Sequence, residues 1–325
     1  MKPCTYFLAA VCTAASLSSQ SVHATSVIAV DNKAGAGGGT FVTANLLGAP
    51  DSQVCSLGNG GYVTLGFAVT IVDGPGADLV VAENPFFSGP VGFAFAETCF
   101  VEVSSNGVDF ARFPSAYYGP QTQPGPFGVV SVGAYAGLGG VCPVYPLANA
   151  LDLVRAGGDA FDLADLKGDP LVLQGKVKLN QITQVRLVDL VSGVDRDSRN
   201  VLIFDPSTGS ADVDGVTVLN HAGNQTAGTP LAALRIPADG NFELVIGDPD
   251  GIQDLDPASL GISVWGTPLA NPFDLLAALP LANVTPTAIT WKLGSALPPG
   301  FLLRLSVSVS DHSGHRSGAT RVRPG

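Results

Sequence analysis

The 325-residue sequence predicts an all-β protein. Glycine (40 residues) and proline (24 residues) are frequent, whereas charged residues make up only 13% of the chain. This balance is typical of many short strands joined by turns. Several segments also alternate apolar and polar residues, the period of two that buries one face of a strand. With 46% hydrophobic residues the chain can form a sizeable core, and its length has room for two domains.

The clearest strand in the first half is predicted over residues 62–72, where Val63, Leu65, Phe67, Val69 and Ile71 alternate with small or polar residues. Residues 79–82 and 184–191 are predicted as further buried strands. Glu83 and Asn84 follow the first of these directly. A strand end is a position from which side chains readily reach a site formed by loops.

A hairpin is predicted over residues 95–113. Cys99, Val101 and Val103 alternate with Phe100, Glu102 and Ser104, and Asn106-Gly107 predicts a primed turn before the return strand at 108–113. This pattern places Cys99 inside a strand as a small buried apolar residue.

A second, smaller domain is predicted over residues 233–325, after a first domain at 25–222 and a polar linker at 223–232. Its strand candidates are residues 242–246, 260–265, 288–293 and 301–310, and residues 272–281 are the best helix candidate. About ninety residues with turns at this spacing fit an Ig-like β-sandwich.

The N-terminus predicts a signal peptide over residues 1–24. Lys2 is followed by an apolar run at 7–17, too short to span a bilayer, and by Val22-His23-Ala24, a cleavage site of small residues. We therefore expect a secreted, extracellular or cell-surface protein. No second long apolar run follows, so membrane insertion after cleavage is not expected.

The net charge of -11 argues against a nucleic-acid partner, which requires clustered Lys and Arg. Solubility outside a cell is a sufficient explanation of the acidic charge, with divalent-cation binding as an addition rather than a rival. Cleavage leaves Cys55, Cys99 and Cys142, which allow at most one disulfide and one free thiol.

Acidic residues in two stretches predict a Ca²⁺ site. Its candidate ligands are Glu83, Asp159, Asp162, Asp165, Asp212 and Asp214. Carboxylates in glycine-bearing loops supply the oxygens that Ca²⁺ prefers, although no EF-hand pattern is present. The alternative is that these aspartates form turns and cap helices. A second acidic cluster, at Asp248, Asp250, Asp254 and Asp256, is weaker evidence of the same kind.

An uncharged stretch at residues 117–146 carries Tyr117, Tyr118 and Tyr135, which are candidate ligand-binding residues. Exposed aromatic rings at the rim of a β-sandwich suit carbohydrate or another surface polymer, and aromatic packing beneath the loop is the alternative. An extracellular polysaccharide hydrolase that uses Glu83, Glu97 or a nearby Asp is a second possible function. Glu97 and Glu102 could form its carboxylate pair, although both occupy a strand pattern in which an outward acid is common. A passive structural component of an outer layer is a third.

Several motifs together resemble a family of secreted bacterial proteins described as cell-surface proteins. They are GYVTLGF at 61–67, GPGADLVVAENPF at 74–86, AFAETCFVEVSSNGVDFARFP at 94–114, GGDAFDLADL at 157–166, TQVRLVDLV at 183–191 and ADVDGVTVLN at 211–220. The resemblance implies a β-sandwich similar to galactose-binding-like jelly rolls, a surface location and no established reaction. This chain departs from the family pattern at Cys99, at Val213 and in having no apolar sorting tail.

The second domain is similar to bacterial Ig-like repeats, through residues 248–252, 259–266 and SVSDHSG at 308–314. Such modules are mostly spacers or adhesive units. The sequence thus predicts a jelly-roll-like β-sandwich followed by a smaller Ig-like β-sandwich. The expected function is adhesion or carbohydrate recognition, with Ca²⁺ as a stabilising ion.

Overall fold

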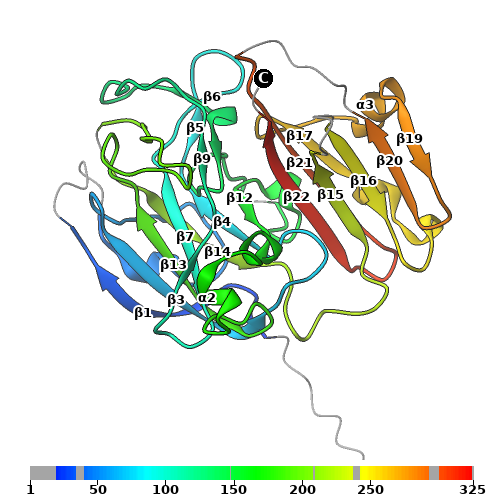
Figure 1. The fold of residues 1–325 in the computed structure, drawn as a ribbon, viewed down its shortest axis with the longest axis horizontal. Coiled ribbons are helices and arrows are strands. Elements are labelled where there is room, and N and C mark those ends of the chain that lie inside the picture. The colour runs from blue at the N-terminus through cyan, green and yellow to red at the C-terminus, as the bar shows by residue number, and fades with distance from the viewer. Residues whose placement is uncertain are drawn as a thin grey trace, which may run out of the picture.

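The computed structural model describes residues 20–33, 40–146, 148–207, 209–236, 242–292 and 300–323. It contains two β-rich lobes side by side, with strands β1 to β14 in the first lobe and β15 to β22 in the second (Figure 1). The strands form six sheets whose pairings are all antiparallel. The all-β prediction is therefore confirmed.

The first lobe contains a five-stranded sheet. Its order is β1 (Ala24–Asp31), β3 (Tyr62–Ile71), β13 (Ile182–Asp189), β7 (Cys99–Ser104) and β8 (Ala111–Arg112). The alternation in β3 has the predicted effect, since Val63, Leu65, Val69 and Ile71 are buried.

A four-stranded sheet accompanies it, in the order β12 (Asp159–Phe161), β4 (Leu79–Glu83), β14 (Asp212–Val218) and β2 (Cys55–Ser56). Every residue of β4 is buried, as expected for a central strand. Side chains of both sheets, among them Leu65, Val81, Leu187 and Val216, share one apolar core.

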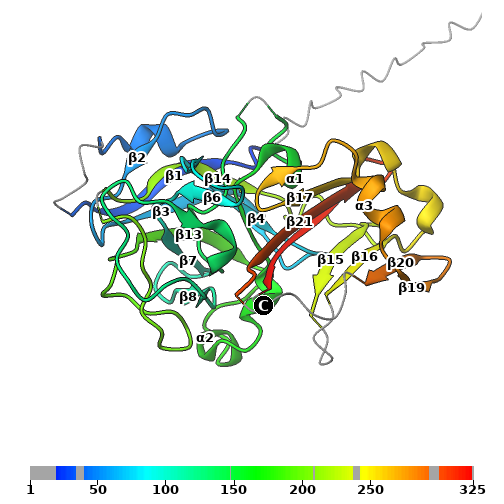
Figure 2. The same cartoon turned by 90° about the horizontal axis from the view of Figure 1, so that it is seen from above.

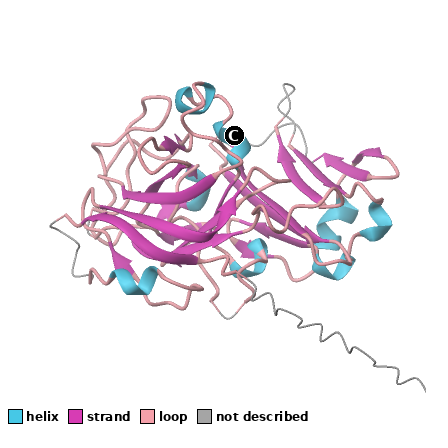
Figure 3. Cartoon of the chain, turned by 90° about the horizontal axis from the view of Figure 1, so that it is seen from below, coloured by secondary structure: helices cyan, strands magenta, loops and turns pink. Residues whose placement is uncertain are grey.

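Short strands and helical turns surround this core (Figure 3). Two small sheets have the orders β10 (Val130–Ser131), β6 (Phe93–Phe95), β5 (Phe86–Phe87), and β11 (Tyr135–Ala136), β9 (Ala116–Tyr117). The helical turns are η1 (Thr43–Leu46), η2 (Val132–Ala134), α1 (Leu153–Ala156), η3 (Leu163–Leu166) and α2 (Pro170–Leu173).

The predicted hairpin between β7 and β8 forms, but the prediction of a primed turn between these strands is wrong. Gly107 has a positive φ of 74° whereas Asn106 does not, and a primed turn requires a positive φ at its first central residue. The strands are instead joined by a wider loop that side chains hold. Asn106 Oδ1 accepts hydrogen bonds from Val108 N and Asp109 N, and Ser104 Oγ accepts one from Gly107 N.

The second lobe has two four-stranded sheets around its own core. One contains β15 (Leu231–Arg235), β16 (Glu243–Gly247), β20 (Ala288–Lys292) and β19 (Leu281–Val284), and the other β18 (Thr267–Pro268), β17 (Gly261–Val264), β21 (Leu303–Ser310) and β22 (Arg316–Arg323). The four predicted strands correspond to β16, β17, β20 and β21. The predicted helix is α3 (Pro272–Ala278), beside the turns η4 (Ile252–Asp254) and η5 (Pro257–Ser259).

Strands β21 and β22 lie next to the first lobe (Figure 2). Polar contacts join the two lobes there and beside β17. Ala77 N donates a hydrogen bond to Gly318 O (2.7 Å), and Ser308 Oγ donates one to Asp152 Oδ1 (3.1 Å). The guanidinium of Arg155 donates to the carbonyl oxygens of Ala258, Ser259 and Leu260. Because these contacts consist of directional hydrogen bonds, they define the orientation of one lobe relative to the other.

The predicted signal peptide lies mostly outside the described residues. Within them, β1 begins at Ala24, and Val22 O accepts a hydrogen bond from Val218 N (2.7 Å). Cys55, Cys99 and Cys142 are buried free thiols. In the part of the chain that the structure describes, no helix is long and apolar enough to cross a membrane.

Candidate functional site

Asp159 is engaged by protein groups on both of its carboxylate oxygens. It lies in β12 and forms an ion pair with Arg304 of β21. Its Oδ2 accepts hydrogen bonds from Val141 N (2.7 Å) and Cys142 N (3.2 Å). These contacts place Asp159 at the junction of the two lobes.

Asp162 precedes the turn η3 and Asp165 lies within it, and the guanidinium of Arg321 lies beside both carboxylates. Asp162 caps the turn through Ala164 N (2.9 Å). Arg321 Nη2 lies 3.0 Å from Asp165 Oδ1 and 3.8 Å from Asp162 Oδ2. The guanidinium of Arg321 therefore balances part of the charge of these two acids.

A carboxylate oxygen of Asp162 also lies within 4.8 Å of oxygens from Asp73 and Asp78. Asp78 is buried and accepts hydrogen bonds from Gly74 N, Asn220 Nδ2 and Leu163 N. Lys167 Nζ lies 2.9 Å from Asp73 Oδ2. This group has the geometry of a cation site, but lysine and arginine already balance much of its charge.

Glu83 and Asp212 meet where β4 pairs with β14. Glu83 Oε1 accepts a hydrogen bond from Asp212 N (2.7 Å), and Asp212 Oδ1 accepts one from Ser56 Oγ. Glu83 Oε2 is buried and has no hydrogen-bond partner among the described residues. Burial, with the nearby charges of Glu97, Asp212 and Asp159, raises the pKa of Glu83 well above its usual range.

Asp214, the last of the predicted ligands, holds a turn. Its two carboxylate oxygens accept hydrogen bonds from Asp51 N (3.0 Å) and Ser52 N (2.9 Å). Ser52 has a positive φ of 72°, a conformation that this anchoring helps to maintain. The six predicted acids therefore lie at several separate places rather than around one point.

An acidic cavity that the sequence did not predict lies beside Glu97. It measures about 130 Å³ and is lined by Glu97, Asp189 and Asp205 together with Gln123, Ser192 and Ser210. Burial, followed by the charges of neighbouring aspartates, raises the pKa of Glu97 to about 8. Burial likewise raises the pKa of Asp189 to about 7 and that of Asp205 to about 6.

Backbone N–H groups donate hydrogen bonds to the carboxylates of both aspartates in this cavity. Asp189 accepts hydrogen bonds from Gly60 N (2.8 Å) and Ala211 N (2.7 Å). Asp205 Oδ2 accepts from Thr98 N (2.9 Å). Asp189 ends β13 and Asp205 lies in a loop, so only the fold brings them to Glu97. Glu102 is paired instead with Arg112 and Arg186 on β8 and β13.

A larger cleft of about 740 Å³ lies between the lobes. Its aromatic lining comes from Phe93, Tyr117, Tyr118 and Tyr135 of the first lobe and from Trp265 and Phe301 of the second. All three predicted ligand-binding tyrosines line it. Two of them are mainly packed in the core, since Tyr117 and Tyr135 are buried with their rings 5.2 Å apart.

The hydroxyl groups of the buried tyrosines are satisfied by the backbone. Tyr117 Oη donates to Pro120 O (2.9 Å) and Tyr135 Oη to Phe204 O (2.6 Å). Tyr118 is half-buried and stacks on the Arg199 guanidinium, whose Cζ lies 4.3 Å from the ring centroid. Tyr118 is thus the predicted tyrosine whose ring is most available to a ligand.

The second lobe contributes a fixed indole to this cleft. Trp265 Nε1 donates a hydrogen bond to Leu302 O (2.7 Å), and Phe301 packs edge-on against the ring at 5.6 Å. Trp265 adopts a positive φ of 51°, unusual for a bulky residue. Backbone conformations of this kind occur often at ligand sites.

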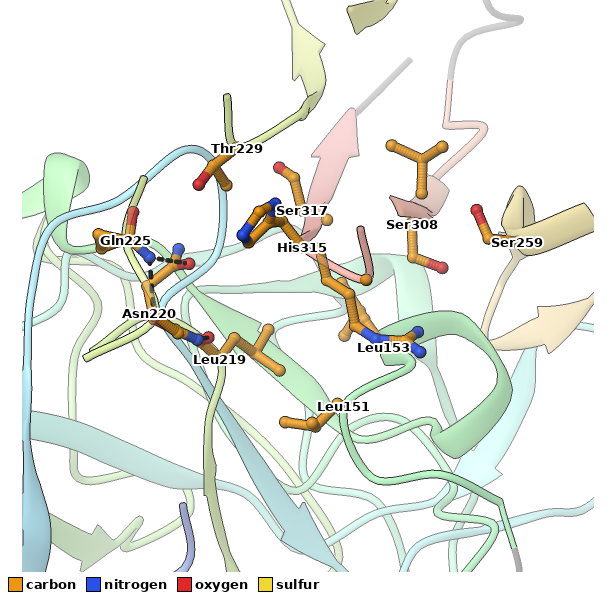
Figure 4. Close-up of a pocket in the computed structure, with 15 residues that line it drawn as sticks. Leu151, Leu153, Leu219, Asn220, Gln225, Thr229, Ser259, Ser308, His315 and Ser317 are labelled. Carbon is orange, nitrogen blue, oxygen red and sulfur yellow. Dashed lines mark hydrogen bonds between the residues drawn. The ribbon is translucent and has the colours of Figure 1, made fainter. Parts of the chain in front are cut away.

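A smaller cavity of about 100 Å³ lies between the lobes on β22. Its lining includes Asn220, Gln225, His315 and Ser317 (Figure 4). Gln225 Nε2 donates to Asn220 Oδ1 (2.8 Å), so part of its polar surface is already paired.

The sequence matches no protein-family model, and a search of curated proteins found no match. The resemblance to bacterial cell-surface proteins therefore remains a prediction.

Proposed function

We propose that the protein is a secreted or cell-surface binding protein that recognises carbohydrate, or another surface polymer, in the aromatic cleft between its lobes. The observation that carries the proposal is the cleft itself. It measures about 740 Å³ and takes aromatic rings from both lobes. This volume is within the range typical of small-ligand sites, and aromatic faces are suited to the apolar faces of sugar rings.

Several rings of the cleft are both accessible and held in place. Phe93, Tyr118 and Trp265 are half-buried, and Phe301 is 36% exposed. The hydrogen bond of Trp265 and the stacking of Tyr118 on Arg199 restrict two of these rings before any ligand arrives. A preorganised surface loses little conformational entropy on binding, which favours affinity.

The proposal includes the finer architecture that the sequence suggested. The first lobe is taken as jelly-roll-like, which a five-stranded and a four-stranded antiparallel sheet around one core support. The second is taken as Ig-like, which two four-stranded antiparallel sheets support. The N-terminal features of a signal peptide support a secreted or surface location, where adhesion is the expected role.

Calcium is proposed as a stabilising ion. Two groups of three aspartates support this, because in each group the carboxylate oxygens lie within 4.8 Å of one another. They are Asp73, Asp78, Asp162 and Asp248, Asp254, Asp311. Ca²⁺ prefers such all-oxygen surroundings.

The geometry supports binding better than hydrolysis. Glu97 has the raised pKa expected of a general acid, but its cavity measures only about 130 Å³. The carboxylates beside it, Asp189 and Asp205, already accept backbone hydrogen bonds. The aromatic cleft has more room for a sugar chain than the acidic cavity has. The two cavities have no lining residue in common.

A glycan array followed by calorimetric titration of the best ligand tests the proposal. Trp265→Ala is expected to weaken binding at least about tenfold, or about 1.4 kcal/mol, as truncation of a central aromatic residue does at hot spots. Phe127→Ala is the matched control, because Phe127 is 84% exposed and does not line the cleft. Equal losses in both variants would place the ligand elsewhere. If the intact protein binds no glycan, the passive outer-layer component becomes the better interpretation.

A further inference from the structure

Three aspartates converge at one end of the second lobe. Asp248 follows β16, Asp254 ends η4 and Asp311 follows β21. One carboxylate oxygen from each lies within 4.8 Å of the others. Only Asp248 and Asp254 are close in sequence, so the fold assembles the group.

Backbone hydrogen bonds fix the segments that carry these residues. His312 N donates to Asp254 O (2.9 Å), and Asp256 N donates to Ser310 O (2.9 Å). Asp248 N donates to Thr287 O (2.8 Å), which ties the first segment to the loop before β20. The main chain therefore holds together the three segments that carry these carboxylates.

Asp248 carries a buried acceptor that lacks a partner. The residue is 1% exposed, and its Oδ1 accepts a hydrogen bond from Asp250 N (2.7 Å). Its Oδ2 has no hydrogen-bond partner among the described residues. Buried polar atoms are nearly always paired, so this carboxylate oxygen is available to a ligand that enters the group of acids.

The charge of this group is only partly balanced by protein. Asp311 is 3% exposed, and it accepts from His315 N (2.8 Å) and pairs with His315 Nδ1 (2.6 Å). His312 Nδ1 lies 3.9 Å from Asp254 Oδ1. Over the described residues, the only basic side chains within 4 Å of these three carboxylates are those of the two histidines. The group at Asp73, Asp78 and Asp162 differs, since Lys167 and Arg321 lie beside it.

We propose that Asp248, Asp254 and Asp311 bind a hard divalent cation, Ca²⁺, at the end of the second lobe. The three carboxylates supply oxygen ligands, and Asp248 Oδ2 is free to coordinate. Ca²⁺ takes six to eight oxygens in flexible geometry, so water and main-chain carbonyls complete the shell. Mg²⁺ demands a near-ideal octahedron and is expected to bind more weakly at an irregular group of this kind.

The ion would clamp the two sheets of the second lobe at one end. Asp248 follows β16 of one sheet, and Asp311 follows β21 of the other. The inference rests on the calcium part of the proposed function and is independent of carbohydrate recognition. A dissociation constant for Ca²⁺ of about 10⁻⁴ to 10⁻³ M is expected, as in other extracellular calcium modules.

The test is calorimetric titration of Ca²⁺ into the metal-free full chain. Asp248→Asn is expected to weaken one binding event at least about tenfold, because even outer-shell changes at metal sites cost that much. Asp250→Asn is the matched control. It removes the same charge two residues away, outside the group, and its backbone N–H to Asp248 is retained. It is expected to titrate as the unsubstituted protein does.

Three outcomes would overturn the inference. If the unsubstituted protein binds no Ca²⁺, the calcium part of the proposed function fails with it, whereas the glycan measurement stands by itself. If Asp162→Asn abolishes binding and Asp248→Asn leaves it unchanged, the ion lies in the first lobe. Tighter binding of Mg²⁺ than of Ca²⁺ would contradict the proposed ion. Should Asp248→Asn fail to fold, the half-buried Asp254 allows the same test as Asp254→Asn.

Discussion

Arg304 of β21 and Asp159 of β12 form an ion pair buried between the two lobes. Arg304 is 3% exposed and Asp159 is 1% exposed. Arg304 Nη1 also donates to Tyr135 O (2.9 Å), so one guanidinium contacts two segments of the first lobe. Its Nε has no hydrogen-bond partner among the described residues. The pair thus fixes one contact between the lobes, although one hydrogen-bond donor of the guanidinium is unused. Its structural role is to hold the lobes in one arrangement.

Removing one member of this pair is expected to be costly. Arg304→Met keeps the length of the side chain but leaves the Asp159 carboxylate buried without a counter-charge. The expected loss in the free energy of unfolding is about 3–5 kcal/mol, measured by urea denaturation.

The double variant Arg304→Met, Asp159→Asn provides the control. Asparagine retains an oxygen that can accept from Val141 N and Cys142 N but carries no charge. The double variant is therefore expected to recover much of the lost stability. A single variant as stable as the unsubstituted protein would show that the pair contributes nothing to the junction.

Gly76 allows a close backbone approach between the lobes. It has a positive φ of 83°, and a Cβ at this position would lie 2.4 Å from Gly318 O on β22. Gly76→Ala is expected to reduce the free energy of unfolding by about 2–4 kcal/mol, because backbone strain and a steric clash add. Urea denaturation measures the effect.

Gly175 separates the two contributions. Its φ is +70°, and a Cβ there would meet nothing within 4 Å. Gly175→Ala therefore carries the backbone strain alone, at about 1–2 kcal/mol. If both alanine variants lose the same stability, the close contact with β22 is not a constraint on the fold.

The strands that the sequence predicted best are those whose alternation reports burial directly. In β3 the apolar period of two coincides with a buried face, so local sequence was sufficient. In β21 the alternation predicts the strand, but Arg304, Ser306, Ser308 and Ser310 on its polar side are buried as well. Strand β22 lacks this signal. It reads RSGATRVR, yet Ser317, Gly318 and Thr320 are buried. Small and polar residues are buried there because the first lobe packs against the strand, a contact that no local pattern contains.

The same reason explains the outcome for the candidate site. Asp159 was predicted as a metal ligand from its spacing to Asp162 and Asp165, but its partner Arg304 lies 145 residues further along the chain. Asp189 and Asp205 were not predicted, since neither belongs to an acidic run. The spacing of acids in the sequence showed that carboxylates are concentrated in these loops. Which of them are paired with a basic side chain depends on tertiary contacts.

Stability is expected to fall as pH rises from about 5 to 8, because of Glu97. Burial raises the pKa of its carboxyl group from an ordinary value near 4.5 to about 8, so the folded protein holds a proton that the unfolded chain has released. When the native state binds more protons than the unfolded state, the free energy of unfolding decreases with increasing pH. Asp189, with its pKa raised to about 7, acts in the same direction.

Glu97→Gln removes this contribution, since the amide stays neutral at every pH. The free energy of unfolding of the variant is expected to fall less steeply between pH 5 and 8, by roughly 1 kcal/mol per pH unit after allowance for partial solvation. Urea denaturation at each pH measures both slopes. Glu243→Gln, at the start of β16 in the other lobe, is the matched control and should reproduce the slope of the unsubstituted protein. Parallel slopes for Glu97→Gln and the unsubstituted protein would mean that Glu97 is already ionised in the folded state at pH 5.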